Sequence, residues 1–288
     1  MNKIDEIFKE GIIDILANGF KDENPRPHYA DGTPAHTLSV NQKIRIYDLE
    51  KEFPITTLRP IAWKTGIKEI LAIFQKQTSD LKDFHNLGIN YWDDWDIGDG
   101  TIGYRYGHTV NRYDLLNKLI KGLKEDPFGR RHIMDLWQEE EFKDESNGLK
   151  PCAFLTMWSV RKVQYLNQEE PEFYLDMTLV QRSGDMLCAS GAGNINEVQY
   201  AALQMMVAQV CGFKPGRFVH FVQNEQIYDR HFEQAKELLR RWSIDGDAPK
   251  LVINPAIKDF KDFTIDDFRM ENYNVKEQNP QLKFELGV

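Results

Sequence analysis

The stretch EFYLDMTLVQRSGD, residues 172–185, reads as a strand followed by a polar turn. Alternate side chains in its first part are apolar, which is the period of a strand with one buried face. The residues on that face are Phe173, Leu175, Met177 and Leu179. Arg182 and Ser183 follow at the strand end, where side chains can face a cleft rather than the core. The stretch therefore predicts a sheet with a polar site at the end of one strand.

Strands and helices are predicted on both sides of this stretch. Runs rich in β-branched and aromatic residues predict further strands at 132–137, 153–160 and Arg217–Tyr228. Apolar residues at helical spacing predict helices over Ile4–Ala17, 62–75, Asn111–Glu125, Asn196–Val210 and Asp229–Trp242. No repeat, low-complexity tract or charged linker interrupts the chain. We therefore expect one α+β domain over residues 1–288.

Local signals indicate where several of these elements end. Asn18-Gly19 after the first helix is typical of a left-handed cap, and Gly212 ends the fourth helix. Asp31-Gly32 lies in a polar, turn-rich run and predicts a tight turn that leads into a strand.

Composition limits the class of protein. With 288 residues, of which 41% are hydrophobic and 12% aromatic, the chain can bury a substantial core. No apolar run approaches the roughly 18 residues that a membrane helix needs, and the first residues, MNKIDEIFKEG, are unlike a signal peptide. We expect a cytoplasmic protein without a membrane partner. The formal charge of −9 argues against broad nucleic-acid binding, although a cluster of arginines could still hold one small anion.

The three cysteines are Cys152, Cys188 and Cys211, which form no CxxC pair and have no metal-ligand spacing. We therefore expect no disulfide framework and no zinc site. Cys152 follows Pro151 in LKPCAF, residues 149–154. A free cysteine is more often a small buried hydrophobe than a nucleophile. A nearby positive charge would favour the nucleophile, because the thiolate is the reactive form.

Arginines are the candidates for that charge. Arg182 with Ser183, and the tandem Arg130 and Arg131 in GRRH, suit a phosphate, since a guanidinium binds two phosphate oxygens and a hydroxyl adds a donor. Solvated surface charges are the alternative.

Two amides, Asn194 and Asn196, stand in GNINEVQY, residues 193–200. Either could read the donor and acceptor edge of a base. A helix N-cap is the alternative for an asparagine at this position.

These motifs together resemble the thymidylate synthase family, whose members use a cysteine and a folate. The similarity runs in chain order over nearly the whole sequence. Its segments are DGTPAHTLS (31–39), AWKTGIKEIL (62–71), YWDDW (91–95), DGTIGYRYG (99–107), RRH (130–132), LKPCA (149–153), QRSGD (181–185), NEVQYAAL (196–203), IYDRH (227–231) and INPAIKDFKDFTIDDF (253–268). The resemblance implies a three-layer fold around a mixed sheet, and a homodimer formed by sheet-to-sheet packing.

The implied reaction is the reductive 5-methylation of dUMP to dTMP with 5,10-methylenetetrahydrofolate. Cys152 would add to C6 of uracil, so that C5 could attack the folate methylene, and the folate would then return a hydride and leave as dihydrofolate. Arg182 would lower the pKa of the thiol and bind the phosphate. The other implied nucleotide ligands in this part of the site are Arg26, Gln181, Ser183 and, from the neighbouring subunit, Arg130 and Arg131.

The resemblance assigns further roles around the base and the sugar. Asn196 would hold N3 and O4 of uracil, and Tyr228 would contact the deoxyribose hydroxyl. Gln226 stands where the family usually has a histidine, which leaves the sugar preference open. Glu69 would order water and move protons at O4, with an exposed structural glutamate as the alternative. Tyr106 would help to remove the C5 proton.

On the folate side the resemblance implies a pocket and a cover. Trp92, Trp95, Leu149 and Asp185 would line the pocket, and Asp185 would also act in catalysis. The C-terminal run KFELGV would close over the folate and exclude water. No metal is implied.

Two other functions remain open at this stage. A pyrimidine nucleotide 5-hydroxymethylase would share the thiolate, phosphate and folate steps but let water take the methylene group. An amide at Asn196, in place of a carboxylate, favours uracil over cytosine. A non-catalytic nucleotide- or RNA-binding descendant should have lost Cys152 or the arginines, and the sequence keeps both.

Overall fold

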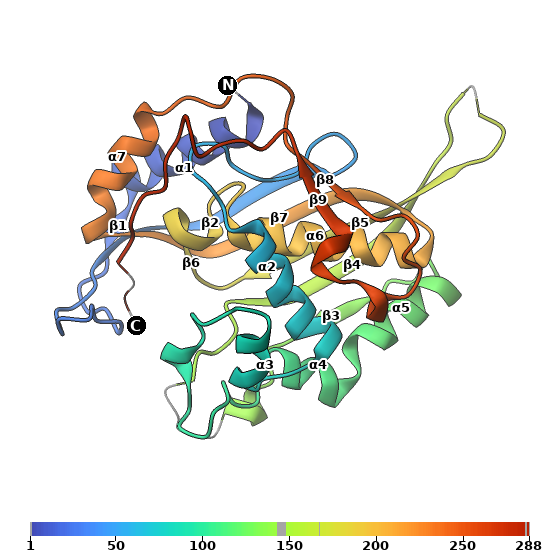
Figure 1. Cartoon of the computed structure of the whole chain (residues 1–288), viewed down its shortest axis with the longest axis horizontal. Helices are drawn as coiled ribbons and strands as arrows, with labels where there is room; N and C mark the ends of the chain where they lie inside the picture. The colour runs from blue at the N-terminus through green and yellow to red at the C-terminus, as the bar shows by residue number, and fades with distance from the viewer. Residues whose placement is uncertain (1, 143–147, 167, 286, 288) are drawn as a thin grey trace.

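A mixed sheet of seven strands forms the centre of the molecule (Figure 1). The computed structural model describes residues 2–142, 148–166, 168–285 and 287. The strands of the sheet are β1 Phe20–Lys21, β2 Thr37–Asp48, β3 Ile133–Asp135, β4 Ala153–Val163, β5 Glu172–Gln181, β6 Gly184–Asp185 and β7 Lys214–Tyr228. Their order is β1-β2-β7-β5-β4-β3, and β6 pairs with the last part of β7. A small second sheet pairs β8 Lys250–Ile253 with β9 Phe268–Glu271.

The strand directions bring particular chain ends together. β5 and β7 are parallel, whereas β2 is antiparallel to β7 and β4 is antiparallel to β5. The first residues of β2 and β4 and the last residues of β5 and β7 therefore lie at one end of the sheet. Ala153 pairs with Gln181 there, and Thr37 pairs with Tyr228. The residue before β4, Cys152, is consequently a neighbour of the residue after β5.

Helices cover one face of the sheet in two layers. The α-helices are α1 Lys3–Asn18, α2 Trp63–Ile70, α3 Leu81–Asn86, α4 Gly107–Tyr113, α5 Leu115–Glu125, α6 Ile195–Cys211 and α7 Phe232–Arg240. Shorter helical turns are η1 Leu71–Lys76, η2 Asp93–Trp95, η3 Glu139–Phe142, η4 Met186–Ser190, η5 Asp229–His231, η6 Phe260–Asp262 and η7 Ile265–Asp267. Helix α6 packs against β5 and β7 on one side and against α2 on the other, which gives the expected three layers. Among the described residues, no helix combines the length and the apolar character that a bilayer crossing requires.

Several sequence-based predictions are confirmed. Met177 and Leu179 of β5 are buried, and the intervening Thr178 is only partly buried, as the alternation predicted. Helix α6 ends at Gly212 with φ 79°, a left-handed backbone that glycine adopts without a steric penalty. The predicted helix over 62–75 begins as α2 and continues as the wider π-helical turn η1.

Two local predictions are wrong. Gly19 has φ −66° and ψ 140°, so it is extended rather than left-handed, because the chain runs directly into β1. A Cβ there would lie 2.3 Å from the Ile15 carbonyl oxygen, and this close approach is what requires glycine. The single helix predicted over Asn111–Glu125 is two helices, α4 and α5. Asp114 interrupts them with φ 52°, a conformation that aspartate tolerates better than most residues.

The second face of the sheet is apolar and remains exposed. Ile44 and Ile46 of β2 lie opposite Phe221 and Val219 of β7, and both isoleucines are more than half exposed, at 61% and 55%. Met157 of β4 is also exposed, at 41%. An uncovered apolar sheet face of this kind is typical of an interaction surface.

Candidate active site

A cavity of about 960 Å³ opens at the end of the sheet where β4 begins and where β5 and β7 end. Residues from α2 and from the start of α6 complete its wall. The residues on this wall that the sequence predicted are Arg26, Glu69, Trp92, Trp95, Tyr106, Leu149, Cys152, Gln181, Arg182, Ser183, Asp185, Asn196, Gln226 and Tyr228. Arg130 and Arg131 are exposed in the segment before β3 and are not part of the wall.

Cys152 lies at the cavity beside a fixed guanidinium. Arg182 Nη2 lies 3.6 Å from the Cys152 sulfur. Arg182 is held by backbone carbonyls, because Nε donates to Pro151 O at 2.9 Å and Nη2 donates to Lys150 O at 2.8 Å. The backbone N–H of Arg182 also donates to Cys152 O at 2.9 Å. The pairing of β4 with β5 brings the two residues together, and the carbonyls of Lys150 and Pro151 hold the guanidinium next to the sulfur.

Two opposing effects act on the pKa of the Cys152 thiol. Burial raises the pKa of Cys152 above the ordinary thiol value, and the positive charges of Arg182 and Arg26 oppose this increase. Arg182 thus acts in the predicted direction, but burial outweighs it. The predicted activation of the sulfur by Arg182 therefore stays a prediction.

Tyr106 contacts the backbone of the cysteine. Its hydroxyl oxygen accepts a hydrogen bond from Cys152 N at 3.1 Å. Burial raises the pKa of Tyr106 well above its usual value, so the hydroxyl remains protonated. The residue has φ 48° and ψ −107°, a strained conformation of the kind that persists at functional sites.

Glu69 is buried in α2 and accepts hydrogen bonds from three side chains. Tyr91 Oη and Gln199 Nε2 donate to Oε2, and Trp92 Nε1 donates to Oε1 at 2.9 Å. Burial raises the pKa of Glu69, and the three donors oppose this increase. The alternative of an exposed structural glutamate is wrong, since Glu69 is 8% exposed and lies on the cavity wall. Sequence reasoning did not assign a role to Tyr91 or Gln199.

The two candidate amides differ in their surroundings. Asn194 is fully buried and caps α6. Its amide donates to the carbonyls of Met186 and Leu187, and its oxygen accepts from Arg59 Nη2 at 2.6 Å. Asn196 is only partly buried, accepts from Gln181 Nε2 at 3.1 Å and donates to Gln199 Oε1 at 3.2 Å. Asn196 is thus the amide that can still form hydrogen bonds to a ligand.

The end of β7 contributes polar groups close to Ser183. The Gln226 amide is best satisfied in the orientation in which its nitrogen donates to the carbonyl of Gly184 at 2.9 Å. In that orientation its oxygen is the atom 3.4 Å from Ser183 Oγ. Burial raises the pKa of Tyr228, so its hydroxyl stays a donor. These groups can donate to an anion or to a sugar hydroxyl.

Asp185 and His231 each present one buried atom without a partner among the described residues, Oδ2 and Nδ1 respectively. With Cys188 they offer three ligand atoms within 4.8 Å of one another. A cation is nevertheless disfavoured there, because Arg59 Nη2 donates to Cys188 O at 3.3 Å and brings a positive charge to the cluster. Asp185 Oδ1 already accepts from two backbone amides, which leaves Oδ2 as a free acceptor for a ligand.

The C-terminal run reaches the cavity. Gly287 lies on the wall, and His231 Nε2 donates to Glu285 O at 2.8 Å. The guanidinium of Arg59 lies 5.2 Å from the Phe284 ring. Residues 286 and 288 of the predicted cover lie outside the described residues. Arg59 was missed by sequence reasoning, because no local pattern distinguishes it from a surface arginine.

Comparisons with known proteins agree on one family. A family model described as thymidylate synthase matches residues 6–288. The thymidylate synthases of Lactococcus lactis subsp. lactis (strain IL1403) and Streptococcus pneumoniae (strain 70585) are each 48% identical to the chain, with 100% of both chains covered. The solved structure of thermostable thymidylate synthase A from Bacillus subtilis superposes with a TM-score of 0.85, at 38% identity over 99% of each chain.

Proposed function

The chain belongs to the thymidylate synthase family and is an enzyme that methylates dUMP to dTMP, and we propose that it works through covalent addition of Cys152 to the uracil ring. The sulfur bonds to C6, and the electrons of the C5–C6 double bond move toward C5 and O4. C5 then attacks the methylene group of 5,10-methylenetetrahydrofolate, and the bond from that carbon to one of its two folate nitrogens breaks. Covalent addition divides one difficult substitution into two easier steps.

The later steps return the sulfur to the enzyme. Loss of the C5 proton expels tetrahydrofolate and leaves an exocyclic methylene on the ring. A hydride from that folate reduces the methylene as the bond between sulfur and C6 breaks. The products are dTMP, dihydrofolate and free Cys152, so carbon, hydride and proton are all accounted for.

The observation that carries the proposal is the pairing of Cys152 with Arg182 at the cavity. The sulfur lies 3.6 Å from a guanidinium that backbone carbonyls hold in place. A thiol of raised pKa next to a positive charge is poised to ionise when a substrate polarises it, rather than to react with any electrophile in solvent. This arrangement suits a nucleophile that acts only with nucleotide bound.

Phosphate binding is proposed for Arg182, Ser183 and Arg26. Arg130 and Arg131 would complete the clamp from a second copy of the chain, because in their own subunit they lie away from the cavity. The exposed apolar face of the sheet supports a homodimer, since a second sheet would bury it. We assign the sugar contacts to Gln226 and Tyr228, supported by their place at the end of β7.

The base is proposed to bind Asn196, which keeps one N–H and one oxygen lone pair after its contacts to Gln181 and Gln199. Glu69 would transfer protons to and from O4 through water, and its raised pKa brings it closer to neutral pH. Tyr106, whose hydroxyl stays protonated beside Cys152, would assist removal of the C5 proton.

The folate is proposed to lie against Trp92, Trp95 and Leu149. The free Oδ2 of Asp185 would accept a hydrogen bond from the pteridine ring. The C-terminal run would cover the folate, which Gly287 on the cavity wall supports. No step of this reaction needs a metal.

The test is an assay with purified protein, dUMP and 5,10-methylenetetrahydrofolate. We expect dihydrofolate to form in step with a product heavier than dUMP by one methylene unit. Tetrahydrofolate together with a hydroxymethyl product would instead show the hydroxymethylase, which the comparisons do not favour. No product with the wild-type chain, under conditions in which a relative is active, would contradict the assignment.

We further propose that residues 1–288 act as one catalytic domain in the cytoplasm. The three free cysteines support a reducing compartment. Localisation of a tagged chain in intact cells tests this.

A further inference from the structure

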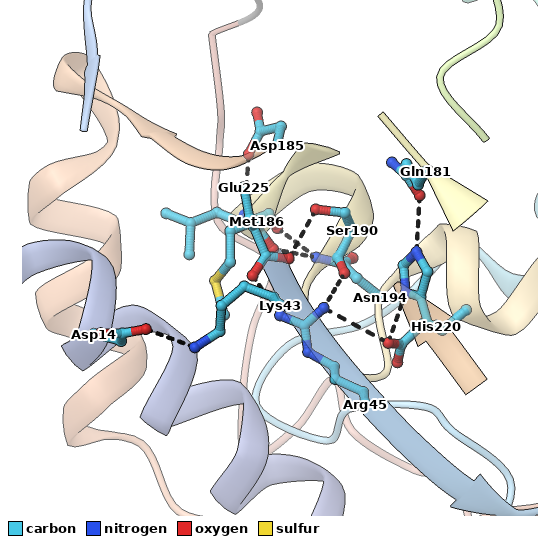
Figure 2. Close-up of polar contacts among 12 residues, drawn as sticks. Asp14, Lys43, Arg45, Gln181, Asp185, Met186, Ser190, Asn194, His220 and Glu225 are labelled. Atoms are coloured by element: carbon cyan, nitrogen blue, oxygen red, sulfur yellow. Dashed lines mark hydrogen bonds and ion pairs between the residues drawn. The ribbon is translucent and has the colours of Figure 1, made fainter. Parts of the chain in front are cut away.

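A group of buried charges lies directly behind the base-binding amide. Figure 2 shows Arg45, Glu225 and His220 with their polar neighbours between β2, β7 and α6. Arg45 Nη2 donates to Glu225 at 2.5 Å, and Arg45 Nη1 lies 3.8 Å from Glu197. Each of these four side chains is at most 4% exposed, namely Arg45, Glu197, His220 and Glu225. None of them is on the cavity wall.

Both ring nitrogens of His220 face acceptors. Nδ1 lies 3.0 Å from Glu197 Oε1, and Nε2 lies 3.0 Å from Gln181 Oε1. The Gln181 amide cannot be reversed at low cost, because its nitrogen donates to the Ser183 carbonyl at 2.9 Å. A neutral imidazole has only one N–H and would leave one of the two acceptors without a proton. An imidazolium, with two N–H groups, would donate to both acceptors.

The charge balance of the cluster leads to the same protonation state. Glu197 accepts at both oxygens, from Gly193 N and from the His220 side, and Glu225 accepts from Arg45 and from Ser190 Oγ. Glu225 thus accepts as a carboxylate from two certain donors, and Arg45 at 3.8 Å favours a carboxylate at Glu197 as well. One guanidinium leaves a buried excess of one negative charge, which an imidazolium neutralises.

A directed series of amides connects this imidazolium to Glu69. His220 donates to Gln181, Gln181 donates to Asn196, and Asn196 donates to Gln199. Gln199 then donates to the Glu69 carboxylate. Each amide in the series thus has its oxygen toward His220 and its nitrogen toward Glu69. The donor at one end and the carboxylate at the other set this direction.

We propose that the His220 imidazolium, paired with Glu197, is a positioning element that fixes the orientation of the Asn196 amide and thereby selects uracil over cytosine. The inference rests on the proposed role of Asn196. Uracil presents an N3–H donor and an O4 acceptor, whereas cytosine presents an N3 acceptor and an amino donor. A cytosine ring could bind only after the Asn196 amide reversed. Reversal would place nitrogen against Gln181 Nε2 and oxygen against Gln199 Oε1, which leaves buried polar groups unpaired.

The protonation state is tested without substrate. Enzyme carrying isotope-labelled histidine is examined by nitrogen NMR, and the His220→Leu variant identifies the His220 signals. We expect protons on both ring nitrogens of His220 near neutral pH. A ring nitrogen without a proton would overturn the proposal, whatever the activity of the enzyme.

The selectivity is tested by binding of dUMP and dCMP, measured by calorimetry on the intact enzyme. In the His220→Leu and Glu197→Gln variants we expect the ratio of the dCMP and dUMP dissociation constants to fall by about tenfold or more, because the amides lose the donor at one of the two ends that set their direction. The exposed His85→Leu is the matched control and should leave the ratio unchanged.

The two variants distinguish a loss of base selectivity from a general loss of nucleotide binding. A merely structural role would weaken both nucleotides by the same factor, so an unchanged ratio in a folded variant would overturn the proposal. Glu197→Gln keeps the imidazole and serves if His220→Leu does not fold. Wild-type enzyme that binds neither nucleotide would refute the proposed function instead, and the NMR result would still decide the state of His220.

Discussion

The two ends of the cavity are built in different ways. We name the two ends after their proposed ligands. The nucleotide end contains Cys152, Gln181, Arg182, Ser183 and Tyr228, and all of them lie at strand ends. The folate end contains Tyr91, Trp92, Trp95 and Leu149 beside Glu69, and these residues come from α2, η2 and loops. Strand pairing holds the first group, whereas hydrogen bonds to Glu69 hold two aromatic residues of the second. A substitution at the nucleotide end should therefore change only its own contacts. A substitution at the folate end should also disturb neighbouring side chains.

Burial raises the pKa of one ionisable group at each end of the cavity, but different neighbours oppose this increase. At the nucleotide end it raises the pKa of Cys152 against two arginines. At the folate end it raises the pKa of Glu69 against three neutral donors. Burial thus favours the protonated form of both groups, which fits our proposal that Cys152 is activated only when nucleotide binds.

The largest effect is expected for the Cys152→Ala variant. Turnover should fall by more than about 10⁴-fold. The other thiol on the cavity wall, Cys188, is a poor substitute, because burial and the Asp185 carboxylate raise its pKa. The local character of the nucleotide end predicts that the dissociation constants of dUMP and of the folate remain close to those of the wild type. Steady-state rates and calorimetry measure the two quantities. Methylation at the wild-type rate would exclude covalent catalysis by this sulfur.

The Glu69→Gln variant should have the next largest effect, and its effect should spread. We expect kcat to fall by about 10²–10⁴-fold from the loss of proton transfer. The KM for the folate should also rise, because an amide cannot accept from Tyr91, Trp92 and Gln199 as the carboxylate does. Glu172→Gln, at a salt bridge to Lys214 outside the cavity, is the control. A lower kcat with an unchanged folate KM would show that the two ends do not differ in this way.

The same contrast explains what could be predicted from the sequence. Strand alternation over residues 172–180 and the polar QRSGD turn placed Arg182 at a strand end, and the structure has it there. Cys152 before β4 and Tyr228 at the end of β7 follow from similarly local patterns. The resemblance to a family then supplied their expected roles, which local patterns do not contain.

Properties that depend on tertiary packing were not predictable. The bond from Tyr91 to Glu69 joins residues 22 positions apart, and no spacing rule marks it. Burial of Cys152 determines the direction of its pKa, and burial is known only once the sheet and α2 enclose the cavity. The break at Asp114 was likewise not predictable, because the surrounding sequence has helical periodicity throughout.

The Arg182→Ala variant tests the local charge at the nucleotide end. Arg182 lowers the pKa of Cys152, so its removal should raise that pKa further and reduce the thiolate fraction at any pH below it. We expect alkylation by iodoacetamide to slow by about tenfold near neutral pH, and the difference should shrink as the pH rises. Mass spectrometry of the Cys152 peptide measures the rate. The exposed Arg240→Ala is the control, and identical pH profiles for the wild type and Arg182→Ala would remove the electrostatic argument.

The smallest effect is expected for the Trp95→Ala variant at the folate end. Trp95 packs edge-on against Trp92, with ring centroids 5.5 Å apart, but no hydrogen bond joins it to Glu69. Its loss should therefore remove apolar wall area without disturbing the carboxylate, and we expect the folate KM to rise by about threefold to tenfold while kcat stays within about twofold. The dissociation constant of dUMP measures whether the effect reaches the other end of the cavity. A change in dUMP binding as large as the change in folate KM would mean that the aromatic side chains, and not only Glu69, couple the two ends.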